Sequence, residues 1–138
     1  MTVTEMKTPY VGVIPYVCVS DARAASRLYE KALGANVTDT RTMGENDPRL
    51  IHCEMIINGN AFMINDPFPE HGMAETGAGS CTLHITVEDL QEWWDRAIAA
   101  GFTPQMEPHD AFWGDRYAVM SDPYGLRWAL VGPKKQAS

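Results

Sequence analysis

The fold is decided by residues 112–130, which read FWGDRYAVMSDPYGLRWAL. Two β-prone runs, over 117–121 and 126–131, flank the tetrapeptide DPYG at 122–125. That tetrapeptide fits a type I turn, because Asp is favoured at the first position, Pro fixes φ at the second and Gly is tolerated at the fourth. The pattern therefore predicts an antiparallel hairpin near the end of the chain.

Upstream of this hairpin the chain uses one pattern twice. In each half a strand-like run leads to an aspartate that can cap a helix, Asp21 or Asp89, and a glycine stops the helix, Gly34 or Gly101. Further strand-like runs follow, and Asn58-Gly59 is a strong signal for a two-residue hairpin turn. Both halves read β-α-β-β-β, which predicts two modules that each need the other to bury their apolar faces.

The motif FWGDRY…DPYGLRW resembles the C-terminal signature of the vicinal oxygen chelate superfamily, which contains glyoxalases, bleomycin-resistance proteins and extradiol dioxygenases. Within that superfamily it is most similar to the PhnB-like branch, and the resemblance extends from about Val11 to Val131. It implies an α+β fold in which two tandem βαβββ modules form a curved mixed sheet with an open cleft, usually in a homodimer.

The module boundaries follow from composition. The residues between the two copies are rich in Gly and Pro, which predicts a linker. We predict one glyoxalase-like domain over residues 1–138, with modules at about 10–66 and 80–132 and a linker at 67–79. Within the first module, residues 43–49 predict a polar loop, because they include Gly, Asn, Asp and Pro.

Composition limits the classes of partner. The 138 residues are 45% hydrophobic with a net charge of −7, which indicates a folded domain and disfavours nucleic acid or an anionic membrane surface as a partner. The N-terminus lacks a signal-peptide pattern, and no apolar run reaches membrane-spanning length. The cysteines, Cys18, Cys53 and Cys81, lack Cys-x-x-Cys spacing, so we interpret them as reduced strand residues of a cytoplasmic protein.

Alternating strand faces define the candidate ligand-binding residues. In the fifth strand, the odd-numbered residues of 83–87 are expected to pack beneath the second helix, which leaves His84 and Thr86 on the opposite side. By the repeat, Tyr16 and Cys18 take that side in the first strand. Aromatic rings at the rim can stack on a planar ligand. The predicted ligand-binding set is Tyr16, Cys18, His52, Glu54, Met63, Phe68, His84, Thr86, Phe112, Trp113 and Arg127.

A metal site of the superfamily's kind is not expected. The resemblance implies His and Glu ligands at positions that fall on Ile14, Thr82 and Ala129 in this sequence. These side chains lack the imidazole, carboxylate or thiolate donors that hold a divalent ion. An alternative set, in a different register and suited to Zn, Ni, Mn or Fe, is His52, Glu54 and His84.

Three hypotheses about function follow from these residues. The main hypothesis is a metal-free protein that binds or sequesters a planar, antibiotic-like ligand, and one form of this hypothesis specifies a cationic ligand. It assigns no catalytic residue and no cofactor. The alternative is a divalent-metal-dependent glyoxalase-type lyase or isomerase, or a dioxygenase, that uses His52, Glu54 and His84. A third hypothesis is a member of the superfamily that binds an unknown metabolite. The expected partners are a small organic ligand and a second copy of the chain.

Overall fold

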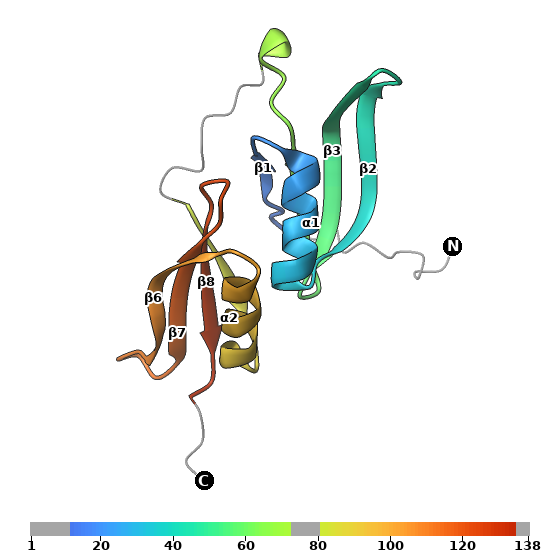
Figure 1. Cartoon of the computed structure of the whole chain (residues 1–138). Helices are drawn as coiled ribbons and strands as arrows, with labels where there is room; N and C mark the ends of the chain where they lie inside the picture. Colours follow the sequence, from blue (N-terminus) through green and yellow to red (C-terminus); the bar gives the residue numbers. More distant parts are fainter. Residues whose placement is uncertain (1–11, 73–80, 135–138) are drawn as a thin grey trace, which may run out of the picture. The chain divides into compact units, whose positions relative to one another are not determined.

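The computed structural model describes residues 12–72 and 81–134, and its contacts divide the chain into two compact units. Unit 1 draws on residues 1–30 and 34–77, and unit 2 on residues 31–33 and 78–138. The order of elements is β-α-β-β-β, and then β-α-β-β-β again (Figure 1). The predicted α+β class and the tandem βαβββ modules are therefore confirmed, with one four-stranded sheet for each module.

The first module is a mixed sheet with one helix. Its sheet order is β1-β4-β3-β2, in which β1 is parallel to β4 and the other neighbours are antiparallel. The helix begins where the Asp21 side chain accepts a hydrogen bond from the N–H of Ala24, and it ends at Gly34, whose φ is 65°. The elements are β1 (Tyr16–Cys18), α1 (Ala22–Leu33), β2 (Asn36–Gly44), β3 (Asp47–Ile57), β4 (Asn60–Asn65) and the 3-10 turn η2 (Pro69–His71).

The second module repeats this topology, with the sheet order β5-β8-β7-β6. Its helix begins where the Asp89 side chain accepts from the N–H of Glu92 at 3.1 Å. Among the described residues, no helix has the length and apolar character needed to cross a membrane. The elements are β5 (Thr82–Thr86), α2 (Leu90–Ala99), β6 (Thr103–Asp110), β7 (Arg116–Ser121) and β8 (Arg127–Gly132).

Both predicted hairpin turns are confirmed. Between β7 and β8, the Gly125 N–H donates to the carbonyl of Asp122, and the Asp122 carboxylate accepts from the N–H groups of Tyr124 and Leu126. Between β3 and β4, Asn58 and Gly59 have φ values of 49° and 88°, which is the left-handed backbone that a type I′ turn needs. Turn chemistry thus positions the strands of both modules.

The predicted polar loop at 43–49 is wrong, because most of it belongs to a hairpin. Strand β2 runs to Gly44 and β3 begins at Asp47. The Asp47 carboxylate accepts from the backbone N–H and the guanidinium of Arg49, so a polar stretch can remain in a strand with its groups satisfied. Register irregularities around Thr42 accommodate the same stretch.

Two other predicted segments are only partly described. The strand-like run that leads to Asp21, at residues 11–19, is observed as the short strand β1, and residue 11 lies outside the described residues. Residues 73–79 of the predicted linker at 67–79 also lie outside them. The described part of that segment contains η2 and the fully buried ring of Phe68.

One face of each sheet carries buried side chains. In unit 1, the ring of Tyr29 packs edge to face on Phe62, with ring centroids 5.9 Å apart. In unit 2, Ile85 on β5 and Val87 just after it are buried, whereas His84 is exposed, as the alternation of side chains along a strand predicts. The opposite faces of the two sheets remain available to carry functional side chains.

The three cysteines are free thiols in different surroundings. Cys53 on β3 is fully buried, Cys18 on β1 is half-buried, and Cys81 is exposed immediately before β5, so Cys81 is not a strand residue. Burial, and secondarily the nearby carboxylates, raises the pKa of the Cys53 thiol to about 11. Their reactivities should therefore differ widely.

At pH 8, iodoacetamide is expected to modify Cys81 and to leave Cys53 unmodified in the folded protein. The thiolate is the reacting species, and with a pKa of about 11 only about one Cys53 thiol in a thousand is ionised at that pH. Because this pKa lies above that of an unfolded thiol, protection is complete below about pH 9 and weakens as the pH approaches 11. Mass spectrometry of Cys81→Ser with and without urea checks this. Equal rates in both conditions would contradict the buried position.

Candidate functional site

A row of side chains crosses all four strands of unit 1 on one face of the sheet. Tyr16 lies opposite Met63, Met63 opposite Glu54, and Glu54 opposite Asp39. His52 precedes Glu54 by two residues on β3, so it shares this face. We call Tyr16, Asp39, His52, Glu54 and Met63 the polar face. Four of its five members belong to the predicted ligand-binding set.

A hydrogen-bond chain joins the members of the polar face. The Tyr16 hydroxyl lies 2.8 Å from His52 Nδ1, and His52 Nε2 lies 2.9 Å from Glu54 Oε1. The hydroxyl of Thr38 is 3.4 Å from Glu54 Oε2. Burial, followed by the charges of Cys53 and Glu54, raises the pKa of Tyr16. The phenol therefore stays protonated at neutral pH and can donate a hydrogen bond.

Asp39, which the sequence pattern does not indicate, joins His52 and Glu54 in a compact donor group. One ligand atom from each of these three residues lies within 4.8 Å of the other two. Asp39 is on the edge strand β2, and a register shift after Val37 brings it opposite Glu54. The sequence contains no signal for that shift, so spacing could not have placed Asp39 here.

Of the other predicted residues of unit 1, Cys18 shares the sheet face of Tyr16, and Phe68 lies elsewhere. Cys18 is paired with Asn65 and is half-buried. Phe68 is fully buried, and the guanidinium carbon of Arg49 sits 4.2 Å from its ring centroid. One face of that ring is thus covered by a cation, and the ring contributes to the core of unit 1. It does not present a surface for stacking.

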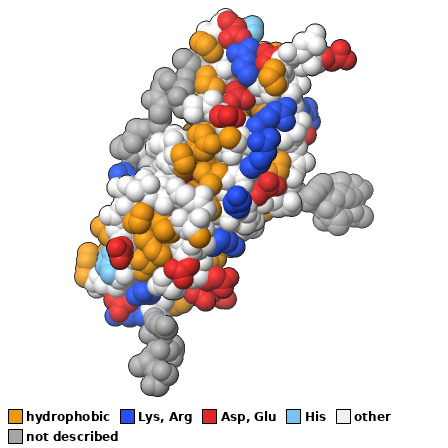
Figure 2. Space-filling model, in the orientation of Figure 1, with side chains coloured by type: hydrophobic (Ala, Val, Ile, Leu, Met, Phe, Trp, Pro, Cys, Tyr) orange, Lys and Arg blue, Asp and Glu red, His pale blue; other side chains and the backbone are white. Residues whose placement is uncertain are grey.

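Aromatic side chains gather on the exposed face of the unit 2 sheet. The ring of Tyr117 is the centre of this group, with centroid distances of 5.2 Å to Trp113 and 5.9 Å to His84. Phe112 packs edge to face on Trp113 at 5.1 Å, and His109 is 6.2 Å from Tyr117. Figure 2 shows hydrophobic side chains gathered over the strands of this unit, with a histidine beside them. We call these five residues the aromatic face.

The neighbours of the aromatic face are small or aliphatic. His84 lies opposite Ala129 and Thr86 opposite Val131. At one edge, Arg127 Nε donates to the Thr82 hydroxyl at 2.7 Å. Of the predicted residues, His84, Phe112 and Trp113 are thus brought together, with Thr86 and Arg127 on the same strand pair. Tyr117 and His109 were missed, although the alternation along 117–121 would have indicated Tyr117.

The positions at which the superfamily resemblance implies metal ligands do not fit a metal ion. Ala129 is a fully buried methyl group, and the Thr82 hydroxyl accepts a hydrogen bond from Arg127. Ile14 has an aliphatic side chain. A divalent ion needs imidazole, carboxylate or thiolate donors, and none of these three residues supplies one.

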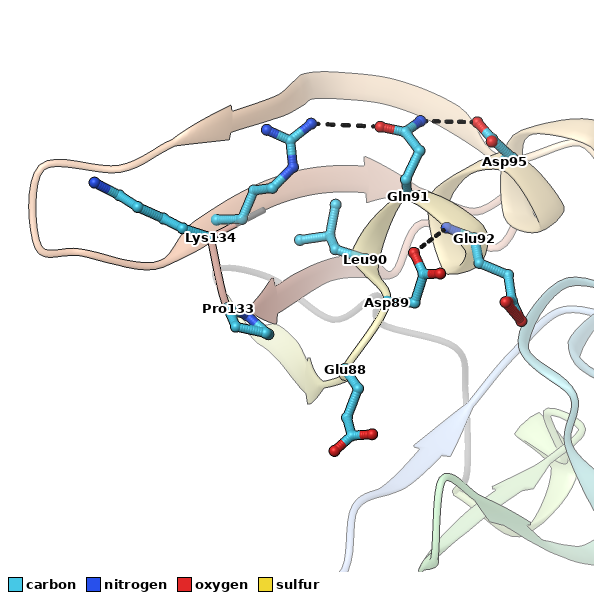
Figure 3. Close-up of a pocket in the computed structure, with 9 residues that line it drawn as sticks. Glu88, Asp89, Leu90, Gln91, Glu92, Asp95, Pro133 and Lys134 are labelled. Carbon is cyan, nitrogen blue, oxygen red and sulfur yellow. Dashed lines mark hydrogen bonds between the residues drawn. The ribbon is translucent and has the colours of Figure 1, made fainter. Parts of the chain in front are cut away.

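A hollow of about 740 Å³ lies at the start of α2 (Figure 3). Its polar side chains bind one another: Gln91 accepts from Arg116 and donates to Asp95, and Asp89 caps the helix through the N–H of Glu92. These contacts stabilise the helix terminus and its neighbouring strand. We assign the hollow a structural role, because its side chains do not converge on a common point.

The tandem βαβββ modules define an α+β fold class, and sequence comparison identifies the family. The model of the Glyoxalase/Bleomycin resistance protein/Dioxygenase superfamily matches residues 10–130, so the chain belongs to this superfamily. The uncharacterized protein Mb0911c of Mycobacterium bovis is 38% identical over 130 residues, which cover 90% of this chain and 84% of that protein.

Solved structures share the fold at lower sequence identity. TioX from Micromonospora sp. ML1 superposes with a TM-score of 0.72 at 18% identity, covering 90% of this chain and 99% of TioX. A PhnB protein from Bacillus cereus, described as a putative 3-demethylubiquinone-9 3-methyltransferase, has a TM-score of 0.67 at 20% identity, covering 88% and 98% of the two chains. At this identity the likeness establishes the fold alone.

Proposed function

We propose that the chain binds a planar organic molecule against the aromatic face of unit 2 and acts by holding it, without a catalytic step. The supporting observation is the exposure of large rings that folded proteins usually bury: Phe112 is 97% exposed and Trp113 is 50% exposed. The ring of Trp113 contacts Phe112 and Tyr117 edge to face. Aromatic side chains have few rotatable bonds, so they lose little conformational entropy when a ligand stacks on them.

The charge of the protein favours a cationic ligand. A net charge of −7 attracts cations over the whole surface, and the π faces of Trp113 and Tyr117 attract them at close range. Stacking of this kind requires no metal cofactor. The same proposal includes membership of the PhnB-like branch of the superfamily, an antibiotic-like ligand, a cytoplasmic location and a homodimer.

Proflavine, a planar cationic dye, is expected to quench the fluorescence of Trp113 in a saturable titration. Trp94 and Trp128 are buried and should respond little. The variant Trp113→Ala should weaken binding roughly tenfold, because it removes one stacking surface. Equilibrium dialysis measures the same affinity without relying on fluorescence, so loss of the fluorophore and loss of affinity can be told apart.

Two matched variants make this titration decisive. Trp113→Phe keeps an aromatic ring and should keep most of the affinity, while Trp93→Phe alters an indole on α2, away from the aromatic face, and should keep all of it. Neutral 2-naphthol and anionic 2-naphthoate, compared with proflavine, report the charge preference. If no planar compound binds, or if Trp93→Phe weakens binding as much as Trp113→Ala, the proposal is wrong.

The donor group of the polar face favours a second candidate function. Asp39, His52 and Glu54 lie together in unit 1, and a divalent ion held there would supply Lewis acidity for a lyase, isomerase or dioxygenase reaction. This candidate replaces His84 of the sequence-based alternative with Asp39. Turnover of a hemithioacetal or a catechol after loading with Zn, Ni, Mn or Fe would support it over sequestration.

A further inference from the structure

We infer that unit 1 binds a divalent transition-metal ion between Asp39, His52 and Glu54. This group differs from the superfamily positions at Ile14, Thr82 and Ala129, and it lies on β2 and β3. The inference is independent of the binding proposed for the aromatic face, because it requires only a cation. It is carried by the arrangement of donors and by the partners that hold them.

Each of the three donors has a second polar atom that is held by a neighbour. Arg41 Nε donates to Asp39 Oδ2 at 2.9 Å, and the Tyr16 hydroxyl lies 2.8 Å from His52 Nδ1. The Thr38 hydroxyl is near Glu54 Oε2, at 3.4 Å. Ligands in metal sites usually carry such outer partners, which orient the donor atoms before the ion arrives.

The contacts of His52 show which of its nitrogens faces the ion. Nδ1 lies 2.8 Å from the Tyr16 hydroxyl, which also lies 3.2 Å from the carbonyl of Ile51, so this hydroxyl can donate to either acceptor. Nε2 faces Glu54 Oε1 at 2.9 Å. When Tyr16 donates to Ile51 and accepts from Nδ1–H, Nε2 carries no proton, and a metal ion takes the place of the proton between His52 and Glu54.

The chemistry of the donors suits a small transition-metal ion. The three donor atoms lie within 4.8 Å of one another, and two ligands with bonds of about 2.1 Å to one ion lie at most about 4.2 Å apart, so the group would contract slightly around the ion. One imidazole with two carboxylates suits Zn, Ni, Mn or Fe(II), whereas Mg and Ca prefer oxygen ligands alone. Three protein ligands leave coordination positions open for a small molecule.

The test is metal binding by the full chain after removal of metals with a chelator. Calorimetry with Zn²⁺ and the visible absorption of added Co²⁺ are expected to report one equivalent. Asp39→Asn should lower the affinity at least about tenfold, and Tyr16→Phe, which removes an outer partner, about tenfold. Asp39 is on an edge strand and only partly buried, so this variant should fold even if Glu54→Gln does not.

His71→Gln and His84→Gln are the matched histidine controls, and both should bind Zn²⁺ as the natural sequence does. Weaker binding in His84→Gln would overturn the inference and assign the ion to the His52, Glu54 and His84 set. Stoichiometric binding that Asp39→Asn leaves unchanged, or no binding of Zn²⁺ and Co²⁺ at all, would also overturn it. In the latter case a proton occupies the position between His52 and Glu54.

Discussion

Asp122→Ala is expected to lower the free energy of unfolding by about 4 kcal/mol. Asp122 is buried, with 6% of the residue exposed, and its carboxylate accepts hydrogen bonds from the N–H groups of Tyr124 and Leu126 and from the indole N–H of Trp128. Alanine removes the acceptor for all three donors. Each buried donor that loses its acceptor costs about 1–3 kcal/mol. Urea denaturation followed by circular dichroism measures the loss.

Asp122→Asn and Asp95→Ala make the comparison specific. Asparagine keeps one acceptor oxygen for the turn but turns a donor toward the Trp128 indole, so its cost should be intermediate, about 2 kcal/mol. Asp95 is an exposed helix residue, and its replacement should change stability by less than about 0.5 kcal/mol. If Asp122→Ala were no more destabilising than Asp95→Ala, the turn would not organise the hairpin as described.

Asp66→Ala is expected to cost about 3 kcal/mol through the corresponding role in unit 1. Its carboxylate accepts from the backbone N–H of Ala22 at 2.8 Å and of Leu50 at 2.6 Å, and all three residues are buried. It therefore joins the first turn of α1 to strand β3. A negative charge at a helix N-terminus is also favourable, which adds to the effect. Thermal unfolding and urea denaturation measure the change.

Asp66→Asn tests the same contact with a smaller change. Its amide oxygen can accept from one of the two N–H groups, so Asp66→Asn should cost about half as much stability as Asp66→Ala. Glu45→Ala, at the exposed turn between β2 and β3, is the control and should be close to neutral. A neutral Asp66→Ala would mean that another group satisfies the N–H of Leu50 when the carboxylate is removed.

The features that sequence predicts well are those set by local chemistry. The turn at Asp122, the helix starts at Asp21 and Asp89 and the Asn58-Gly59 turn each depend on a few adjacent residues. The repeat of these signals in two halves was enough to predict the tandem modules. Strand parity then placed Tyr16, His52 and Glu54 on one face, because side chains alternate strictly along a regular strand.

The features that sequence misses depend on register and on long-range packing. Asp39 comes opposite Glu54 only because β2 is irregular after Val37. Phe68 reads as a loop aromatic between prolines, yet its ring is buried beneath Arg49. Residues 43–49 have the composition of a loop, but within strand β3 the Asp47 carboxylate accepts a hydrogen bond from the Arg49 guanidinium. In each case a contact with a neighbouring element overrides the local preference.

The nuclear magnetic resonance spectrum of the four tryptophan indole N–H groups during addition of proflavine tests the ligand-binding account most directly. The account predicts that the resonance of Trp113 shifts progressively and saturably, while those of the buried Trp94 and Trp128 stay in place. It also predicts that prior removal of metals by a chelator leaves this shift unchanged. A spectrum in which Trp113 does not move, or moves only after a metal is added, would contradict binding at the aromatic face.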